Sequence, residues 1–126
     1  MTDYDLQFYS GPLVASRRWL KDHHDEALAV MKGYSAGVAT VYRDKVASQR
    51  ILGKYTKTDD QTLLEDSYQR LLKILPKEPL PKVEAIKSSL DQSTAPAAKA
   101  ADPGSFIDPS FVQELEKSGF YDQLYK

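Results

Sequence analysis

The chain has 126 residues, a length that suits one small domain and is short for two. Its 17 basic and 18 acidic residues give a formal charge of −1, so no charge excess indicates nucleic-acid binding. It contains no cysteine, which excludes disulfides, thiolate metal sites and cysteine nucleophiles.

The N-terminal stretch predicts one or two short strands over residues 4–15. Leu6 and Phe8 alternate with polar neighbours, and a short apolar run follows at residues 13–15. Pro12 cannot donate to a strand ladder, so this segment is expected to form an edge, a bulge or a bend.

Helical periodicity dominates residues 16–126. Ser16 is expected to cap a short helix that runs from Arg17 to about His23. A long helix then begins near Asp25, because apolar residues recur there at spacings of three and four. These residues are Ala27, Met31, Tyr34, Val38 and Val41.

Two glycines, Gly33 and Gly37, lie inside this long helix and weaken it. Their spacing of four is interpreted as room for close packing of another element. The next helix is predicted over residues 44–55, with its apolar stripe at Val46, Ala47, Ile51 and Tyr55.

A turn with capping residues at 58–60 precedes a further helix that ends at Pro76. Its apolar residues repeat at spacings of four, three and four: Leu64, Tyr68, Leu71 and Leu75. Prolines at 76, 79 and 81 predict an extended, stiff link after it.

The C-terminal third predicts two more short helices separated by a surface loop. Val83, Ile86 and Leu90 indicate the first helix, and residues 91–104 contain no large apolar residue, which is typical of a loop. Asp108 and Pro109 are a favourable start for the last helix. Its expected buried face is Phe111, Val112 and Leu115, its stop is Gly119, and the apolar tail of Phe120, Leu124 and Tyr125 is expected to dock.

The predicted fold is therefore mostly α, with five or six helices and one strand-like segment. One or two strands do not form a stable sheet alone. Partner strands are accordingly expected upstream in a longer chain or in a second copy of this chain.

Few residues offer catalytic or metal chemistry. His23 and His24 stand beside Asp22 and Asp25, but neighbouring helical residues point about 100° apart and suit one metal ion poorly. A solvated helix junction is the favoured interpretation, and no metal or cofactor is expected. The acidic pairs at 59–60 and 65–66 belong to caps and helix surfaces, so no enzymatic activity is predicted.

The candidate ligand-binding residues are Tyr9, Ser10 and Gly11, at the end of the predicted strand. An aromatic residue beside a glycine at a strand end suits the wall of a ligand cleft. The simpler alternative, which is favoured, is that Tyr9 packs on the first helix.

Four segments, in order, resemble the C-terminal part of the NitT/TauT-type substrate-binding proteins of bacterial ABC importers. They read GPLVASRRWLKDH at 11–23, ILGKYTKTDD at 51–60, a stretch at 68–80 that ends LPKEPLP, and 101–120 with FIDPSFVQEL and a final GF. His24 stands where proline is common in this family. The resemblance extends over about residues 5–126.

This resemblance implies one C-terminal subdomain, residues 1–126, within a type II periplasmic-binding-protein lobe. Such proteins close two lobes on a small solute and deliver it to a membrane permease in the periplasm or outside the cell. The family includes aliphatic-sulfonate, taurine and thiamine-pyrimidine binders. Implied partners are the solute, the ABC permease and the N-terminal lobe, and the chain alone is not expected to bind solute.

Residues 1–10 carry two acidic residues and no apolar core, so they are not expected to be a signal peptide. No stretch of the sequence approaches the roughly 18 apolar residues of a membrane span. A different function class stays open, namely a stand-alone helical module for interaction or oligomerisation.

Overall fold

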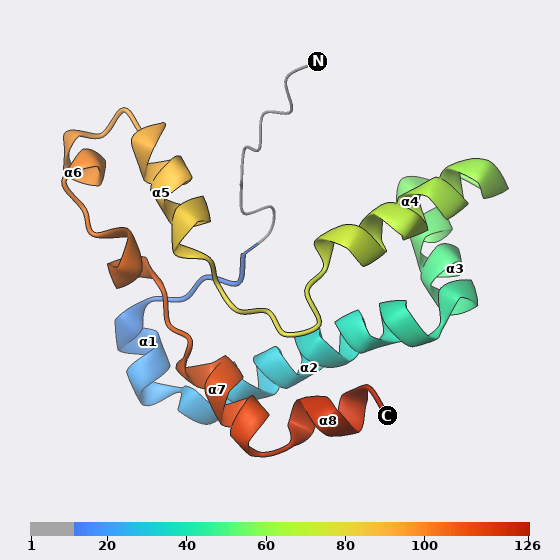
Figure 1. The fold of residues 1–126 in the computed structure, drawn as a ribbon, viewed down its shortest axis with the longest axis horizontal. Coiled ribbons are helices and arrows are strands. Elements are labelled where there is room, and N and C mark those ends of the chain that lie inside the picture. The colour runs from blue at the N-terminus through green and yellow to red at the C-terminus, as the bar shows by residue number, and fades with distance from the viewer. Residues whose placement is uncertain (1–11) are drawn as a thin grey trace. The chain divides into compact units, whose positions relative to one another are not determined.

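The structure of the chain is a computed structural model that describes residues 12–126 (Figure 1). It consists of helices and the links between them, and no strand is present in this range. The mostly helical fold class is thereby confirmed for the described residues. The elements are α1 (Arg17–Asp22), α2 (His24–Arg43), α3 (Lys45–Thr56), α4 (Gln61–Ile74), α5 (Val83–Asp91), α6 (Pro96–Lys99), the 3-10 helix η1 (Pro103–Phe106), α7 (Ser110–Lys117) and α8 (Phe120–Leu124).

The described residues divide into two compact units, each built from two separate stretches of chain. Unit 1 comprises residues 12–22 and 81–109, with α1, α5, α6 and η1. Unit 2 comprises residues 23–80 and 110–126, with α2, α3, α4, α7 and α8. The single subdomain predicted over residues 1–126 stays a prediction.

The segment before α1 differs from its predicted strand conformation. Residues 12–16 have no regular secondary structure, so the predicted strand is absent from its last part. Leu13 and Val14 are exposed in unit 1 and have no neighbouring strand to pair with. The earlier part of that predicted strand, residues 4–11, lies outside the described residues.

Caps and a long-range hydrogen bond help to hold the elements of unit 1 together. The hydroxyl of Ser16 accepts a hydrogen bond from the backbone N–H of Trp19, at 3.2 Å, which confirms the predicted start of α1. The guanidinium of Arg17 donates to the carbonyl of Ser105, and η1 packs against α5. Among the described residues of unit 1, only Ala85 is buried.

The predicted loop over residues 91–104 contains short helical structure. It holds the single turn of α6 and the start of η1, where Asp102 accepts a hydrogen bond from the N–H of Gly104 at 3.1 Å. Pro96 and Pro103 each occupy the start of a helix, a position that tolerates the missing N–H group. None of these residues is buried, which agrees with the expected lack of core contact.

The core of unit 2 forms where α7 and α8 pack against α2. Val112, Leu115 and Tyr121 are buried together, and five partly buried apolar side chains surround them: Leu28, Met31, Phe120, Leu124 and Tyr125. Gly119 adopts a left-handed conformation, φ 72°, between α7 and α8, so a glycine is needed there. The predicted buried face of α7 and the docking of the C-terminal tail are both confirmed.

Tyrosine hydroxyls join α2 to α4 and to the proline-rich link. Tyr68 on α4 is buried, and its hydroxyl donates to the carbonyl of Val41 at 2.9 Å. Tyr42 donates to the carbonyl of Leu75 at 2.6 Å, just after the end of α4. In both residues the ring is packed and the hydroxyl group is hydrogen-bonded, as expected for tyrosines in a protein interior.

The apolar stripe predicted for α3 is wrong. Val46, Ile51 and Tyr55 are 77%, 49% and 78% exposed, whereas Ser48 is the buried residue of this helix. Ser48 fits because its hydroxyl donates to the carbonyl of Asp44 at 2.7 Å, which satisfies its polar group. The packed side of α3 thus includes the small Ser48 beside the half-buried Leu52.

The interpretation of the α2 glycines is also wrong. A methyl group added at Gly33 or at Gly37 would meet no atom of residues 12–126 within 4 Å, so neither glycine serves close packing of another described element. Gly53 on α3 is the closely packed glycine instead, because its added methyl would lie 2.8 Å from the backbone oxygen of Thr58.

Candidate functional site

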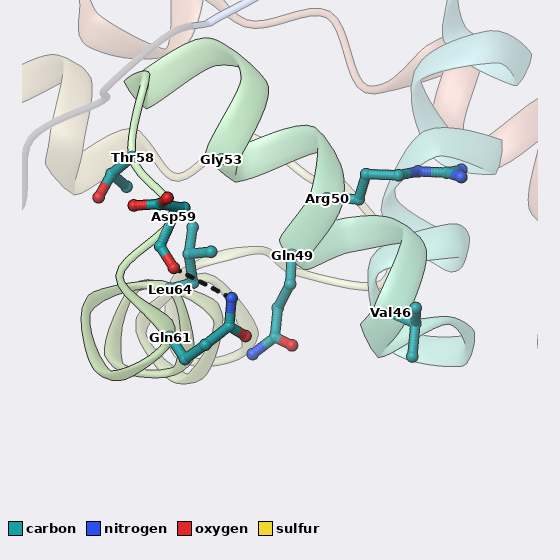
Figure 2. A pocket seen from close by; sticks show the side chains of 8 residues that line it. All are labelled: Val46, Gln49, Arg50, Gly53, Thr58, Asp59, Gln61 and Leu64. Carbon is teal, nitrogen blue, oxygen red and sulfur yellow. Dashed lines mark hydrogen bonds between the residues drawn. The ribbon is translucent and has the colours of Figure 1, made fainter.

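An open groove lies between α3 and the start of α4 in unit 2, with a volume of about 350 Å³ (Figure 2). Its lining combines apolar, amide and charged side chains with a glycine. The lining residues are Val46, Gln49, Arg50, Gly53, Thr58, Asp59, Gln61 and Leu64. The two helices meet through Gly53 and the buried Leu64, so the floor of the groove is apolar.

Figure 2 shows how the polar side chains are distributed around this groove. Val46, Gln49 and Arg50 come from α3, while Thr58, Asp59 and Gln61 come from the turn and the start of α4. Arg50 extends away from the side of the groove where Asp59 lies (Figure 2). The groove therefore has a cationic end and an anionic end, with amides between them.

The geometry of the turn is fixed by capping. Lys57 adopts the left-handed conformation, φ 55°, which ends α3, and the N–H of Thr58 donates to the carbonyl of Gly53 at 3.2 Å. The carboxylate of Asp60 then accepts hydrogen bonds from the N–H groups of Thr62 and Leu63, at 2.9 and 3.1 Å. This confirms the predicted cap and fixes the backbone of the turn that borders the groove.

A polar network ties the two helices together. The carboxylate of Glu65 lies 2.7 Å from the Lys45 ammonium and accepts hydrogen bonds from Gln49 at 2.7 Å and Gln69 at 3.0 Å. The hydrogen bond from Lys45, followed by the one from Gln69, lowers the pKa of this carboxyl below its usual value. Glu65 therefore remains ionised and acts as a structural acceptor.

The predicted ligand-binding residues Tyr9, Ser10 and Gly11 lie outside the described residues. Their assignment stays a prediction.

The histidine pair lies at the junction between α1 and α2, as predicted. His24 has its Nε2 atom 3.0 Å from Glu114 on α7 and its Nδ1 atom 3.5 Å from Asp25. Its ring also stacks on Phe111, with 5.1 Å between ring centroids. His24 is therefore a packing and hydrogen-bonding residue that joins α2 to α7, rather than a purely solvated one.

The described residues contain neither a metal-binding cluster nor a membrane-spanning helix. No three His, Asp or Glu side chains within residues 12–126 gather closely enough to hold a metal ion. No helix in this range has the length and apolar character needed to cross a bilayer.

Comparisons with protein-family models, with curated proteins and with solved structures found no match to this chain.

Sequence reasoning missed the groove and the exposed face of α3. The usable signal was the charge of residues 45–56, which contain three basic residues and no acidic one. A basic helix whose apolar residues are spread around its circumference does not place all of them in a core.

Proposed function

We propose that this chain is the C-terminal part of an ABC-importer substrate-binding protein of the NitT/TauT type. In this function it helps to capture a small solute outside the cytoplasm and deliver it to a membrane permease. The observation that carries the proposal is the ordered resemblance of four sequence segments. The helices α1, α3, α4 and α7 each contain part of one of these segments.

The composition of unit 1 gives physical support. Its described residues bury only Ala85, and they leave several large apolar side chains exposed: Leu13, Val14, Trp19, Val83 and Phe106. Burial of apolar surface is the main term that favours folding, so this unit gains little from its own contacts. Further strands of a binding-protein lobe are a suitable cover for these side chains.

The chain alone is proposed to bind solute weakly or not at all. Affinity in a two-lobed binding protein comes from closure of both lobes around the solute. The groove between α3 and α4 is open and is lined by residues of unit 2 alone. Calorimetry with taurine, an alkanesulfonate and an aminopyrimidine tests this directly, and micromolar binding by the isolated chain would contradict it.

A chimera tests the function itself. Residues 5–126 replace the corresponding C-terminal segment of a NitT/TauT-type protein whose solute is known. We expect the chimera to fold and to be stabilised by that solute, by about 2.7 kcal/mol at a concentration of 100 Kd. The matched control carries Leu115→Asp in the same chimera, which places a charge in the core and should abolish folding.

The outcomes of this experiment are distinct. A folded chimera that the solute stabilises supports the proposed function. A chimera that stays unfolded, while the unaltered parent folds under the same conditions, contradicts the proposed relationship.

A second function has one observation in its favour. The exposed apolar side chains of α3 suit a stand-alone helical interaction or oligomerisation module. Sedimentation of the purified chain over a range of concentrations tests self-association. A monomer at every concentration argues against an oligomerisation module.

A further inference from the structure

The solvent side of α3 carries two adjacent rows of side chains with different chemistry. Ala47, Ile51 and Tyr55 are spaced by four residues and form an apolar row along the helix. Arg50 and Lys54, also four apart, form a basic row beside it. The two rows meet where the Lys54 ammonium lies 5.8 Å from the centroid of the Tyr55 ring.

The basic row is not neutralised by its own helix. α3 contains three cationic residues and no carboxylate, and Lys57 adds a cation at its end. Lys45 is paired with Glu65, but no hydrogen bond or ion pair within residues 12–126 engages the guanidinium of Arg50. The net charge of the whole chain is −1, so this cationic face is a local feature.

The groove between α3 and α4 lies beyond the basic row, on the side away from the apolar row, because Val46 and Gly53 project about 140° or more from Ile51 and Tyr55 around the helix. Val46 and Arg50 both line the groove, and Val46 is mostly exposed. One docked helix that covers the apolar row does not reach this groove, so the docking surface consists of the two rows alone.

We propose that this face is a docking surface for a short acidic amphipathic helix of a partner protein. The apolar side of that helix would cover Ile51 and Tyr55. Its carboxylates would pair with Arg50 and Lys54. Charge complementarity of this kind raises the association rate and fixes the orientation of the docked helix.

The surrounding charges favour a helix over a flat anionic membrane. Asp59 and Asp60 are exposed on the turn that follows α3, where a bilayer surface would meet and repel them. A helix is narrow enough to lie along α3 and avoid this turn. The surface belongs to unit 2 alone, so it is independent of the proposed transport function and would be present under either function.

The test uses two labelled helical peptides of the same length and the same leucine positions. One carries Glu at its polar flanking positions and the other carries Lys. Fluorescence anisotropy with the full chain should show that the Glu peptide binds about tenfold tighter or more at low salt. This preference should shrink as ionic strength rises, because exposed charges are screened.

Two double variants that change the net charge by the same amount complete the test. Arg50→Glu with Lys54→Glu should abolish the preference for the Glu peptide, since both cations of the row are reversed. Lys32→Glu with Lys73→Glu, on the exposed surfaces of α2 and α4, changes the net charge equally and should preserve the preference. Circular dichroism verifies that both variants keep the helical content of the parent.

Three results would overturn the proposal. The first is equal affinity for the two peptides, and the second is an unchanged preference in the Arg50→Glu/Lys54→Glu variant. The third is binding to vesicles with about 30% phosphatidylglycerol that depends on Arg50 and Lys54 when the Glu peptide does not bind. That last result would assign the face to an anionic lipid surface.

Discussion

Alanine in place of a helical glycine is expected to raise the stability of this chain at two positions and to lower it at a third. The difference follows from the space around each glycine. At Gly33 and Gly37 an added methyl group meets no atom of the described part of the chain within 4 Å, so Ala introduces no clash there. Alanine is favoured over glycine in a helix interior by about 0.5–1 kcal/mol, because glycine loses more backbone entropy on folding. The double variant Gly33→Ala/Gly37→Ala should therefore raise the free energy of unfolding by about 1–2 kcal/mol.

Gly53 also lies in a helix, where alanine is intrinsically favoured over glycine, but its surroundings differ. Its added methyl would lie 2.8 Å from the oxygen of Thr58, a backbone atom held by the cap of α3. Displacing Thr58 weakens the hydrogen bond from its N–H to the Gly53 carbonyl. Overpacking of this kind costs about 1–3 kcal/mol, which equals or exceeds the propensity gain, so Gly53→Ala should destabilise the chain.

Urea unfolding followed by circular dichroism at 222 nm measures all three effects on the same signal. The midpoint should move up for Gly33→Ala and Gly37→Ala and down for Gly53→Ala. Stabilisation by Gly53→Ala as large as that by the α2 substitutions would refute the packing assigned to the turn. Destabilisation by both α2 substitutions would refute the exposed placement of these glycines.

Two further predictions concern capping and charge. Asp60→Ala removes the cap of α4 and should cost about 1 kcal/mol, whereas Asp59→Ala should change stability by less than about 0.5 kcal/mol; parallel urea titrations compare them. The pKa of Glu65 is lowered from 4.5 on folding, so its stabilising effect is present above that value and is lost as pH falls through the lower, folded-state pKa. The urea midpoint should therefore fall more steeply below pH 4.5 in the parent than in Glu65→Gln, and identical slopes would contradict this.

The helices with one wide apolar stripe were predictable from sequence. Leu64 and Tyr68 on α4, and Val112 and Leu115 on α7, are buried as their spacing indicated. Large apolar residues at spacings of three and four leave one helical face to bury, so sequence and packing agree. The helix caps were predictable because they are local: the side chains of Ser16 and Asp60 accept hydrogen bonds from backbone N–H groups within three residues.

The face of α3 was not predictable by the same rule. Val46, Ile51 and Tyr55 suggested a stripe, yet the buried residue of the helix is Ser48, and α4 approaches closely at Gly53, where an added methyl group would lie 3.6 Å from the Leu64 side chain. The close approach of two helices depends on tertiary packing. Small residues such as serine and glycine allow it without adding to the hydrophobic pattern of the sequence. The groove depends on this approach, so the candidate site was hidden for the same reason.

The order in which the core of unit 2 is completed has a consequence for synthesis of the chain. The buried pair of Ser35 and Tyr121, whose hydroxyl oxygens lie 3.4 Å apart, is separated by 86 residues. At about 5–20 residues per second, a ribosome needs roughly 4–17 s to add that much chain. During this time the apolar side of α2 has been made but its cover has not. The core of unit 2 is therefore completed only after α8 has been made, and the apolar side of α2 stays uncovered in the nascent chain until then.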